Sequence, residues 1–364
     1  MSIRSAFAAP LASRALGLPS VPRFDESYID LSGEFPTGIT SPALREMTID
    51  AIDQHLCDHY SRRPGVFQLC SAVASVLSSA GLKVDESMVT ICGGVAEARY
   101  AALRALGGGQ IVYVPSPFPS VYRSALEFAG GSVCEFDVDA DLPAATGGLL
   151  VVANPSPVTG QLYNENTLRR LANWVSQSNL MVIADESIGP IRFGSVRHRF
   201  GAMPGMGSCT LTIGSFSENS GLGAWHVSWF AGVKALATPA RDLKQSITIA
   251  SAAASQYAAL AAVTEASYGS HDKVRTNEFD AFLAVLDRHQ IDYLRPDTTA
   301  FVVANVANVT AVAAACLSLG VIVANGAVFG NLGKIRIALP EGHGSDALKK
   351  VDAVFSRVLG AGNE

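Results

Sequence analysis

Short, almost continuously apolar runs that alternate with helical segments most constrain the fold of this 364-residue chain. Four of these runs predict buried strands, at residues 110–114, 148–153, 180–184 and 209–213. Residues 121–129 and 166–177 predict helices between them. Strands that are apolar along their whole length are typical of parallel sheets covered on both faces. The sequence therefore predicts an α/β fold whose ligands bind beyond the carboxyl ends of the strands.

The chain is longer than one hydrophobic core usually organises, so we expect a large and a small domain. The Ala-rich, Gly-free stretch 236–268 predicts a single helix that links them. Beyond it, strands are expected at 300–304, 321–324 and 334–338 between helices, which predicts a smaller α/β domain. Our expected division gives residues 1–40 to an N-terminal arm and part of the small domain, 41–265 to the large domain and 266–364 to the small C-terminal domain.

Composition argues against several classes of partner. The net charge is −5 and no basic block or basic–aromatic stripe occurs, so nucleic acid is not an expected partner. No apolar run approaches the ~20 residues that span a bilayer, so no membrane association is expected. The six cysteines are scattered without a CxxC or Cys/His pairing. That spacing predicts reduced thiols in a cytoplasmic protein and no metal site.

The first 23 residues contain three arginines, and no acidic residue precedes Asp25. This composition is typical of a transit peptide. The same segment contains three prolines and lacks a strong amphipathic pattern. These features favour the alternative, an N-terminal arm that crosses onto a partner subunit.

The segment that follows the run at 209–213 carries the most informative motif. It reads Gly214-Ser215-Phe216-Ser217-Glu218-Asn219-Ser220-Gly221-Leu222-Gly223-Ala224-Trp225-His226. It resembles the pyridoxal-phosphate lysine motif of the class I/II aminotransferases of fold type I. Four residues match that motif: Ser215, Ser217, Gly221 and Leu222. Glu218 stands where the family has its Schiff-base lysine, and His226 stands where the family has an arginine.

This resemblance covers about residues 28 to 360, and is closest to the histidinol-phosphate aminotransferase branch by length and by one further element. That element is Asp58-His59-Tyr60-Ser61-Arg62-Arg63-Pro64-Gly65. In the family its tyrosine reaches the cofactor phosphate of the neighbouring subunit, so the resemblance implies a homodimer in which Tyr60 acts in trans. It also implies a mostly parallel seven-stranded sheet between helices in the large domain.

Two strand ends carry groups that the resemblance assigns to the cofactor ring. Asp185 follows the run at 180–184, where an acid can pair with a protonated pyridine nitrogen. Asn154 opens the turn Asn154-Pro155-Ser156-Pro157-Val158-Thr159-Gly160, and its amide can donate to the phenolic oxygen. A loop carboxylate or helix cap is the alternative for Asp185, and an ordinary Pro/Gly turn is the alternative for Asn154.

Other residues are expected around the phosphate and the ring. Gly94 precedes a helical run, so the backbone N–H groups of Val95 and Ala96 can bind phosphate, with hydroxyls from Ser215 and Ser217. A plain helix cap is the alternative. Two aromatic residues, Phe118 and Tyr122, lie beyond the run at 110–114, one to stack on the ring and one to contact substrate, unless both are core aromatics.

Arg336, in Lys334-Ile335-Arg336-Ile337-Ala338, resembles the arginine with which the family grips the substrate α-carboxylate. A planar guanidinium suits bidentate carboxylate binding, and the alternative is a surface arginine on an edge strand. On an alternating strand, Arg336 points to the face opposite its two isoleucine neighbours. The resemblance therefore implies a small-molecule partner that is an amino acid or related carboxylate.

Three departures from the family pattern bear on function. Glu218 cannot form an imine, His226 replaces a phosphate-binding arginine, and Ile188 stands where the family has a tyrosine. We therefore expect pyridoxal phosphate or pyridoxamine phosphate to be held non-covalently, and ordinary transamination to be crippled or absent. In one interpretation the protein is an enzyme that uses the untethered cofactor, with Glu218 as acid or base. In the other it is a catalytically inactive relative with a structural, regulatory or ligand-binding role.

Overall fold

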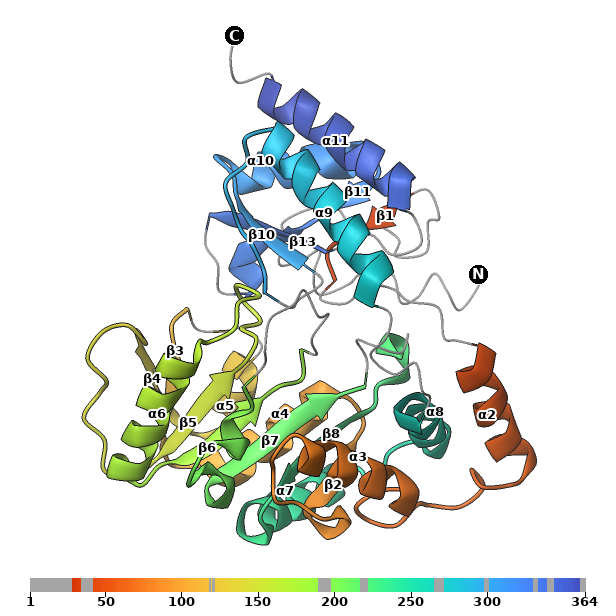
Figure 1. Cartoon of the computed structure of the whole chain (residues 1–364), viewed down its shortest axis with the longest axis vertical. Coiled ribbons are helices and arrows are strands. Elements are labelled where there is room, and N and C mark those ends of the chain that lie inside the picture. The colour runs from red at the N-terminus through yellow and green to blue at the C-terminus, as the bar shows by residue number, and fades with distance from the viewer. Residues whose placement is uncertain are drawn as a thin grey trace.

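The computed structural model describes residues 28–33, 42–117, 119, 122–188, 198–216, 222–264, 272–297, 301–329, 333–338 and 344–360. A seven-stranded sheet forms the centre of the larger unit (Figure 1), with strand order β2-β8-β7-β6-β5-β3-β4. Its strands are β2 (Val89–Cys92), β3 (Ile111–Pro115), β4 (Ser132–Phe136), β5 (Leu149–Ala153), β6 (Met181–Asp185), β7 (Thr210–Ser215) and β8 (Ser228–Gly232). Only β8 runs antiparallel to its neighbours within this sheet. The prediction of a mostly parallel, seven-stranded sheet is confirmed.

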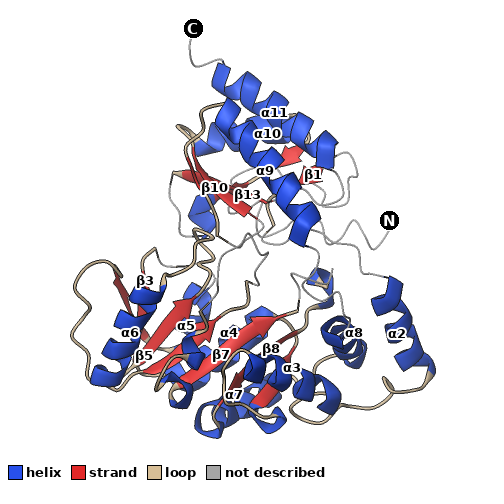
Figure 2. Ribbon diagram, in the orientation of Figure 1, coloured by secondary structure: helices blue, strands red, loops and turns tan. Residues whose placement is uncertain are grey.

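Helices cover both faces of this sheet (Figure 2). One face carries α4 (Val95–Gly107), α5 (Arg123–Ala129) and α7 (Lys234–Ile247), and the other carries α3 (Phe67–Ser79), α6 (Glu165–Ser178) and α8 (Ala253–Thr264). Strand β5 shows why its sequence is apolar throughout. Leu149 and Val151 pack toward α4, whereas Leu150 and Val152 pack toward α6. A strand buried on both faces has no solvated side, so alternation is lost.

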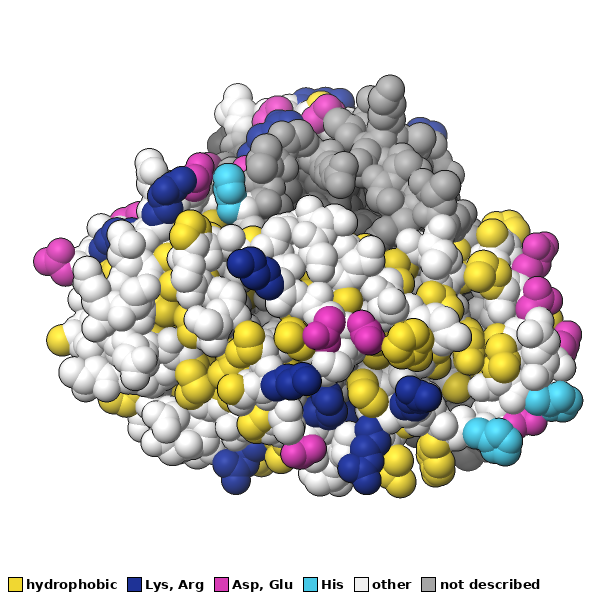
Figure 3. Space-filling view, turned by 60° about the horizontal axis from the view of Figure 1, so that its bottom comes forward, with side chains coloured by type: hydrophobic (Ala, Val, Ile, Leu, Met, Phe, Trp, Pro, Cys, Tyr) yellow, Lys and Arg dark blue, Asp and Glu magenta, His cyan; other side chains and the backbone are white. Residues whose placement is uncertain are grey.

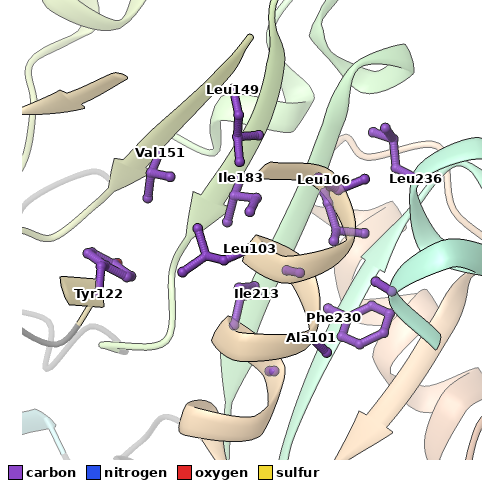
Figure 4. Close-up of a cluster of buried hydrophobic side chains, with 14 of the residues drawn as sticks. Ala101, Leu103, Leu106, Tyr122, Leu149, Val151, Ile183, Ile213, Phe230 and Leu236 are labelled. Carbon is purple, nitrogen blue, oxygen red and sulfur yellow. The ribbon is translucent and has the colours of Figure 1, made fainter. Parts of the chain in front are cut away.

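The core beneath α4 fixes the position of that helix (Figure 4). Leu103 and Leu106 of α4 lie against Ile183 and Ile213 of the central strands, and all four are at most 6% exposed. Phe230 of β8 is fully buried in the same cluster. Burial of each such side chain contributes about 1.5–3 kcal/mol, so α4 is held firmly against the sheet, with its amino end near the carboxyl ends of the strands.

A second, antiparallel sheet forms the smaller unit (Figure 1). Its strands, in order, are β12 (Ala324–Asn325), β13 (Lys334–Ala338), β10 (Phe301–Asn305) and β9 (Tyr293–Leu294). Helices α9 (Asp272–Arg288), α10 (Val309–Ser318) and α11 (Gly344–Gly360) share a core with it. Strand β1 (Ile29–Asp30) pairs in parallel with β11 (Val321–Ile322), and Leu31 is buried in that core. Residues 28–33 therefore belong to the smaller unit.

The prediction of one continuous helix over 236–268 is wrong. Helix α7 ends at Ile247, α8 begins at Ala253, and Thr248 between them is extended at φ −138° and ψ 126°. The break falls at the β-branched run Ile247-Thr248-Ile249, whose side chains disfavour helix. Absence of glycine was a poor guide, because β-branched residues can end a helix as well. Helix α2 (Pro42–Asp53) packs against α8.

The surface agrees with the mild charge of the sequence. On the face shown in Figure 3, basic and acidic side chains lie scattered among apolar ones. Among the described residues, no helix combines the length and apolarity that crossing a bilayer requires. No cluster of three or more His, Cys, Asp or Glu suited to a metal ion occurs in that part of the chain. All six cysteines are free.

Candidate functional site

The carboxyl end of β6 presents a buried ion pair. Arg99 of α4 places its Nε 2.6 Å from Oδ2 of Asp185, and the hydroxyl of Tyr122 donates to the same oxygen at 2.6 Å. The other carboxylate oxygen, Oδ1, accepts from the backbone N–H of Ser187 at 2.9 Å. Arg99 also donates from Nη2 to the Ser187 hydroxyl at 3.0 Å. Charge-assisted hydrogen bonds of this kind hold Asp185 in one orientation.

Burial and pairing act on Asp185 in opposite directions. Its side chain is 2% exposed, and this burial raises the pKa of the carboxyl. The Arg99 guanidinium lowers the same pKa, as do hydrogen bonds from Ser187, Tyr122 and Arg99. The net result is a pKa of Asp185 below its ordinary value, so the carboxylate is ionised at neutral pH. Asp185 is therefore a charged group whose counter-ion comes from the protein itself.

Sequence reasoning missed Arg99, although a signal was present. Val95, Arg99, Leu103 and Leu106 fall at helical spacing on the face of α4 that meets the sheet. An arginine on an apolar stripe has to find an acid, because an unpaired buried charge is very costly. Asp185 was the available partner at the carboxyl end of a strand beneath that helix.

Asn154 lies beside Asp185 at the end of the neighbouring strand. Its backbone N–H donates to the Asp185 carbonyl at 3.0 Å. Its side-chain amide donates to the backbone carbonyl of His198 at 3.4 Å, and its Oδ1 accepts from the N–H of Tyr163 at 3.0 Å. The side chain, only 4% exposed, thus ties its own loop to the one that contains His198. The predicted contact of Asn154 with a cofactor stays a prediction.

The amino end of α4 is a glycine turn with a histidine against it. Gly94 is the N-cap residue at φ +99°, a conformation that glycine adopts without strain. A Cβ added to Gly94 would lie 3.3 Å from Nδ1 of His226, so the imidazole packs directly on the turn. Val95 and Ala96 form the first turn of the helix, as predicted from the Gly94 motif. Together these groups form a corner rich in hydrogen-bond donors.

An acid already partly occupies that corner. Oε2 of Glu97 accepts from the Gly93 N–H at 2.5 Å, and its Oε1 accepts from the Thr248 hydroxyl at 2.5 Å. A carboxylate in the first turn is the usual partner of a helix amino end. An incoming phosphate would share the turn with this charge.

Ser215 lies at the end of β7 opposite Ser228 of β8, at the same edge of the sheet as Asp185. The hydroxyl of Ser228 is buried with no hydrogen-bond partner within the described residues. Phe118, Ser217 and Glu218 lie outside the described residues, so their predicted roles rest on the sequence. The structure therefore brings together Asn154, Asp185 and Ser215 at three neighbouring strand ends.

Arg336 lies apart from these groups, on the sheet of the smaller unit. Ile335 and Ile337 face the core under α9 to α11, and Arg336 points to the opposite face, as its alternation predicts. Its guanidinium carbon lies 3.3 Å from the ring centroid of Phe329 and 4.9 Å from that of Phe301. The side chain is almost completely buried, and Nη2 donates to the Ser32 carbonyl at 3.2 Å. It is thus held by two aromatic rings and is not a surface arginine.

The two units meet through Asp297. Its side chain accepts from the N–H of Leu162 at 2.8 Å, and its own N–H donates to the Gly160 carbonyl at 3.3 Å. These bonds join the turn after Asn154 to the segment that follows β9. Both bonds lie in the turn that follows β5. They therefore connect the smaller unit to the end of that strand.

Tyr60 is exposed, with 79% of its surface accessible. Its loop is held from below by the fully buried Gln256, which accepts from the Val66 N–H at 2.7 Å and donates to the Ser61 hydroxyl at 3.1 Å. An open cavity of about 550 Å³ lies beside Tyr60, with Arg62 and Tyr257 in its wall. Among the described residues, no contact joins Tyr60 to Asp185.

The amino-acid sequence is similar to a family of known proteins. The family model described as "Aminotransferase class I and II" matches residues 26–352. The kynurenine–oxoglutarate transaminase of Dictyostelium discoideum is 23% identical over 317 residues, 77% of this chain and 73% of that protein. The aspartate aminotransferase of Streptomyces avermitilis is 27% identical over 233 residues, 59% of this chain and 56% of that protein.

A solved structure matches over almost the full length. Aspartate aminotransferase from Thermus thermophilus with maleate superposes with a TM-score of 0.83 at 21% identity, and covers 98% of this chain and 99% of that one. This likeness concerns the fold. It agrees with the α/β architecture and the two units described above.

Proposed function

The chain belongs to the aminotransferase class I and II family, and we propose that this member binds an amino acid or related carboxylate without a Schiff base to lysine. We propose further that it does not carry out ordinary transamination. One observation carries the proposal. Arg99 already neutralises Asp185, the acid that the resemblance assigns to a protonated pyridine ring.

Glu218 supports this proposal from the sequence. A glutamate side chain has no amine, so it cannot form an imine with a carbonyl compound. Two further positions differ from the family pattern. His226, at the glycine turn, replaces an arginine, and Ile188, just after the end of β6, replaces a tyrosine. Loss of a positioned acid–base group alone lowers a rate by roughly 10²–10⁴.

The residues fit pyridoxal phosphate or pyridoxamine phosphate only in part. The Gly94 turn, with the first N–H groups of α4 and His226 beside it, suits a phosphate group. The end of β6 does not suit a protonated pyridine, because the ion pair with Arg99 leaves no uncompensated negative charge on Asp185. We therefore propose that any such cofactor binds non-covalently, and we give it no catalytic role.

Arg336 is the group that we propose for the carboxylate. Its position between Phe301 and Phe329 fixes the plane of the guanidinium, and a fixed fork binds a carboxylate with little loss of side-chain freedom. Relatives are named for aspartate and for kynurenine with oxoglutarate, which are amino acids and a dicarboxylate. Maleate, a dicarboxylate, accompanies the similar Thermus thermophilus structure. These names define the ligands to try first.

Maleate binding tests the proposal. The wild-type protein is expected to bind maleate, aspartate or oxoglutarate in a calorimetric titration, and Arg336→Leu is expected to lose at least tenfold in affinity because the charged fork is removed. Arg295→Leu is the matched control, since Arg295 lies on the same unit but is exposed and paired with Asp280. Equal affinities in wild type and Arg336→Leu would contradict the role of Arg336.

A second candidate function keeps an enzyme role, and the Gly94 turn favours it. The Gly94 turn keeps the free backbone N–H groups that suit a phosphate, and the His226 imidazole lies beside it. An anionic substrate or cofactor could bind there. In that case Glu218 serves as acid or base toward the bound molecule. If wild type turns over a substrate and Glu218→Ala loses this turnover but keeps its affinity for the ligand, the protein is an enzyme. A binding protein would show no such turnover.

We also propose a homodimer in which Tyr60 reaches the partner's site. Tyr60 is exposed on a loop that Gln256 holds rigid, and apolar side chains of the nearby α2 region are exposed. Those side chains are Met47, Ile49, Ile52 and Leu56. Multi-angle light scattering is expected to give twice the 38.1 kDa chain mass. A monomer at micromolar concentration would refute the dimer.

A further inference from the structure

We propose that the cavity beside Tyr60 binds a second anionic group of the ligand, a carboxylate or a phosphate, through the guanidinium of Arg62. The protein then selects amino acids or related carboxylates that carry two anionic groups over those that carry one. This inference rests on the proposed function for the first carboxylate, at Arg336, and for the homodimer, in which Arg62 acts beside Tyr60 in trans. It adds a ligand class and the residue that determines it.

The wall of the cavity suits an anion. Its volume of about 550 Å³ is usual for a ligand pocket. The wall contains the cation of Arg62 and the imidazole of His59, and no acidic residue lines it within the described part of the chain. Ala253, the first residue of α8, lines it as well, and the first turn of that helix has no acid. The positive end of the helix dipole therefore adds to the charge of Arg62.

The side chain of Arg62 is available to a ligand. It is exposed, and among the described residues it forms no ion pair and no hydrogen bond. The nearest acid in the sequence, Asp58, lies in the wall of an adjoining hollow and is paired with His55 at 2.8 Å. The charge of Arg62 is therefore not balanced by that carboxylate.

The loop that carries Arg62 is held in one conformation. Gly65 has φ +127°, and a Cβ added there would lie 2.5 Å from Cγ1 of Ile91, so only glycine fits where the loop passes β2. The Pro64 carbonyl accepts from the Ile91 N–H at 2.7 Å. The fully buried Gln256 adds one hydrogen bond on each side of Arg62. A charged group on a fixed loop loses less freedom when a ligand binds, which favours affinity.

Exposed apolar side chains in the same wall indicate that another surface covers the cavity. Tyr60 is 79% exposed, Phe67 51% and Leu56 46%, and all three line the cavity. Apolar surface of this kind marks an interface. In the proposed homodimer the partner covers this wall, which excludes water and strengthens the attraction between Arg62 and an anion. The open cavity of one chain thus becomes an enclosed part of the partner's site.

Three amino acids with the same backbone test the ligand class: alanine with a methyl group, aspartate with a second carboxylate, and O-phosphoserine with a phosphate. In calorimetric titrations, wild type is expected to bind aspartate or O-phosphoserine at least about tenfold more tightly than alanine. The tighter of the two identifies the second group as a carboxylate or a phosphate. Arg62→Leu is expected to reduce the preference to less than about threefold, because the cation is removed.

Two further variants control for the loss of an arginine. Arg63→Leu removes the neighbouring charge, which does not line the cavity, and is expected to keep the wild-type preference. Arg62→Lys keeps a cation without the planar fork, and is expected to keep a preference of about fivefold. A merely structural role of Arg62 would lower the affinity for all three amino acids alike. The anion-binding role lowers the affinity for aspartate or O-phosphoserine and leaves that for alanine unchanged.

A mixed dimer tests the arrangement in trans. One subunit carries Arg62→Leu and the other carries Arg336→Leu, and different affinity tags allow the mixed dimer to be purified. In the proposed arrangement, one of its two sites keeps both arginines, so aspartate is expected to bind with wild-type affinity at about half the wild-type stoichiometry. If both arginines of a site came from one chain, no site would keep both.

The inference is overturned if wild type binds alanine as tightly as the other two amino acids, or if Arg62→Leu keeps the preference. A monomeric wild type, or a mixed dimer without a wild-type site, also overturns it. The proposed role of Arg336 fails separately, when Arg336→Leu binds maleate as wild type does. Equal binding of alanine and aspartate, with both lost in Arg336→Leu, therefore refutes only this inference, whereas a wild type that binds none of these ligands refutes both.

Discussion

Replacement of Arg99 by leucine is expected to lower the free energy of unfolding by about 3–5 kcal/mol, because it leaves the Asp185 carboxylate buried without a cation. The loss is large compared with the total stability of a typical domain, about 5–15 kcal/mol. Asp185→Asn is expected to destabilise by a similar amount, since it removes the carboxylate that balances the buried charge of Arg99. Urea unfolding followed by circular dichroism measures both.

The double variant Arg99→Leu with Asp185→Asn separates pairing from simple loss of side chains. Once one charge is gone, removal of the other relieves an unpaired buried ion, so the two losses are expected to be far from additive. Arg104→Leu, on the same helix but with its guanidinium on the Ala129 carbonyl, is expected to cost less than about 1 kcal/mol. Additive losses from Arg99→Leu and Asp185→Asn, within about 0.5 kcal/mol, would show that the pair is not coupled.

The pair also predicts how stability depends on pH. The pKa of Asp185 in the folded state lies below the ordinary value of 3.8. A depressed carboxyl pKa stabilises the fold fully at pH values above the unfolded-state pKa, and this contribution is lost as the pH falls through the folded-state pKa. Wild type is therefore expected to lose this part of its stability only below about pH 4, and Arg99→Leu is expected to lack it. An identical acid dependence in the two proteins would contradict the assignment.

Helix α4 and the strand ends near it were predictable from the sequence only in part. Asp185 and Asn154 were predicted from their positions at strand ends, because the carboxyl ends of parallel strands meet at one edge. The glycine turn was predicted from the place of Gly94 before a helical run. The partner of Asp185 was not predicted, since Arg99 lies 86 residues away and no local pattern connects them. Only the apolar stripe of α4, which Arg99 interrupts, indicated that this arginine had to be paired inside.

The same contrast applies to the fold. Strands β5, β6 and β7 were predicted to within one or two residues, because runs buried on both faces are apolar throughout. Strand β4 has exposed residues and lies at the sheet edge, so it lacks that signal and was not predicted from its residues. The break between α7 and α8 was missed because it depends on β-branched residues and on packing, and no glycine marks it.

Amino transfer from aspartate or kynurenine to oxoglutarate is expected to be lower than in a lysine-containing relative by at least roughly 10²–10⁴, even with added pyridoxal phosphate. The physical reasons are the glutamate at position 218 and the charge balance at Asp185. A coupled assay with the purified protein measures this rate, and an aspartate aminotransferase of the same family is the positive control. A rate in the ordinary range of that control would refute the proposal.

The most direct test is an absorbance titration of the purified protein with pyridoxamine phosphate and then pyridoxal phosphate, followed by borohydride reduction and mass analysis of the intact chain. The account predicts no visible-range band from a lysine–cofactor bond, no mass added by reduction, and weak binding that is reversible by dialysis. A saturable band together with a reduced adduct on one lysine would contradict it, because the chain would then have found a covalent anchor in place of residue 218.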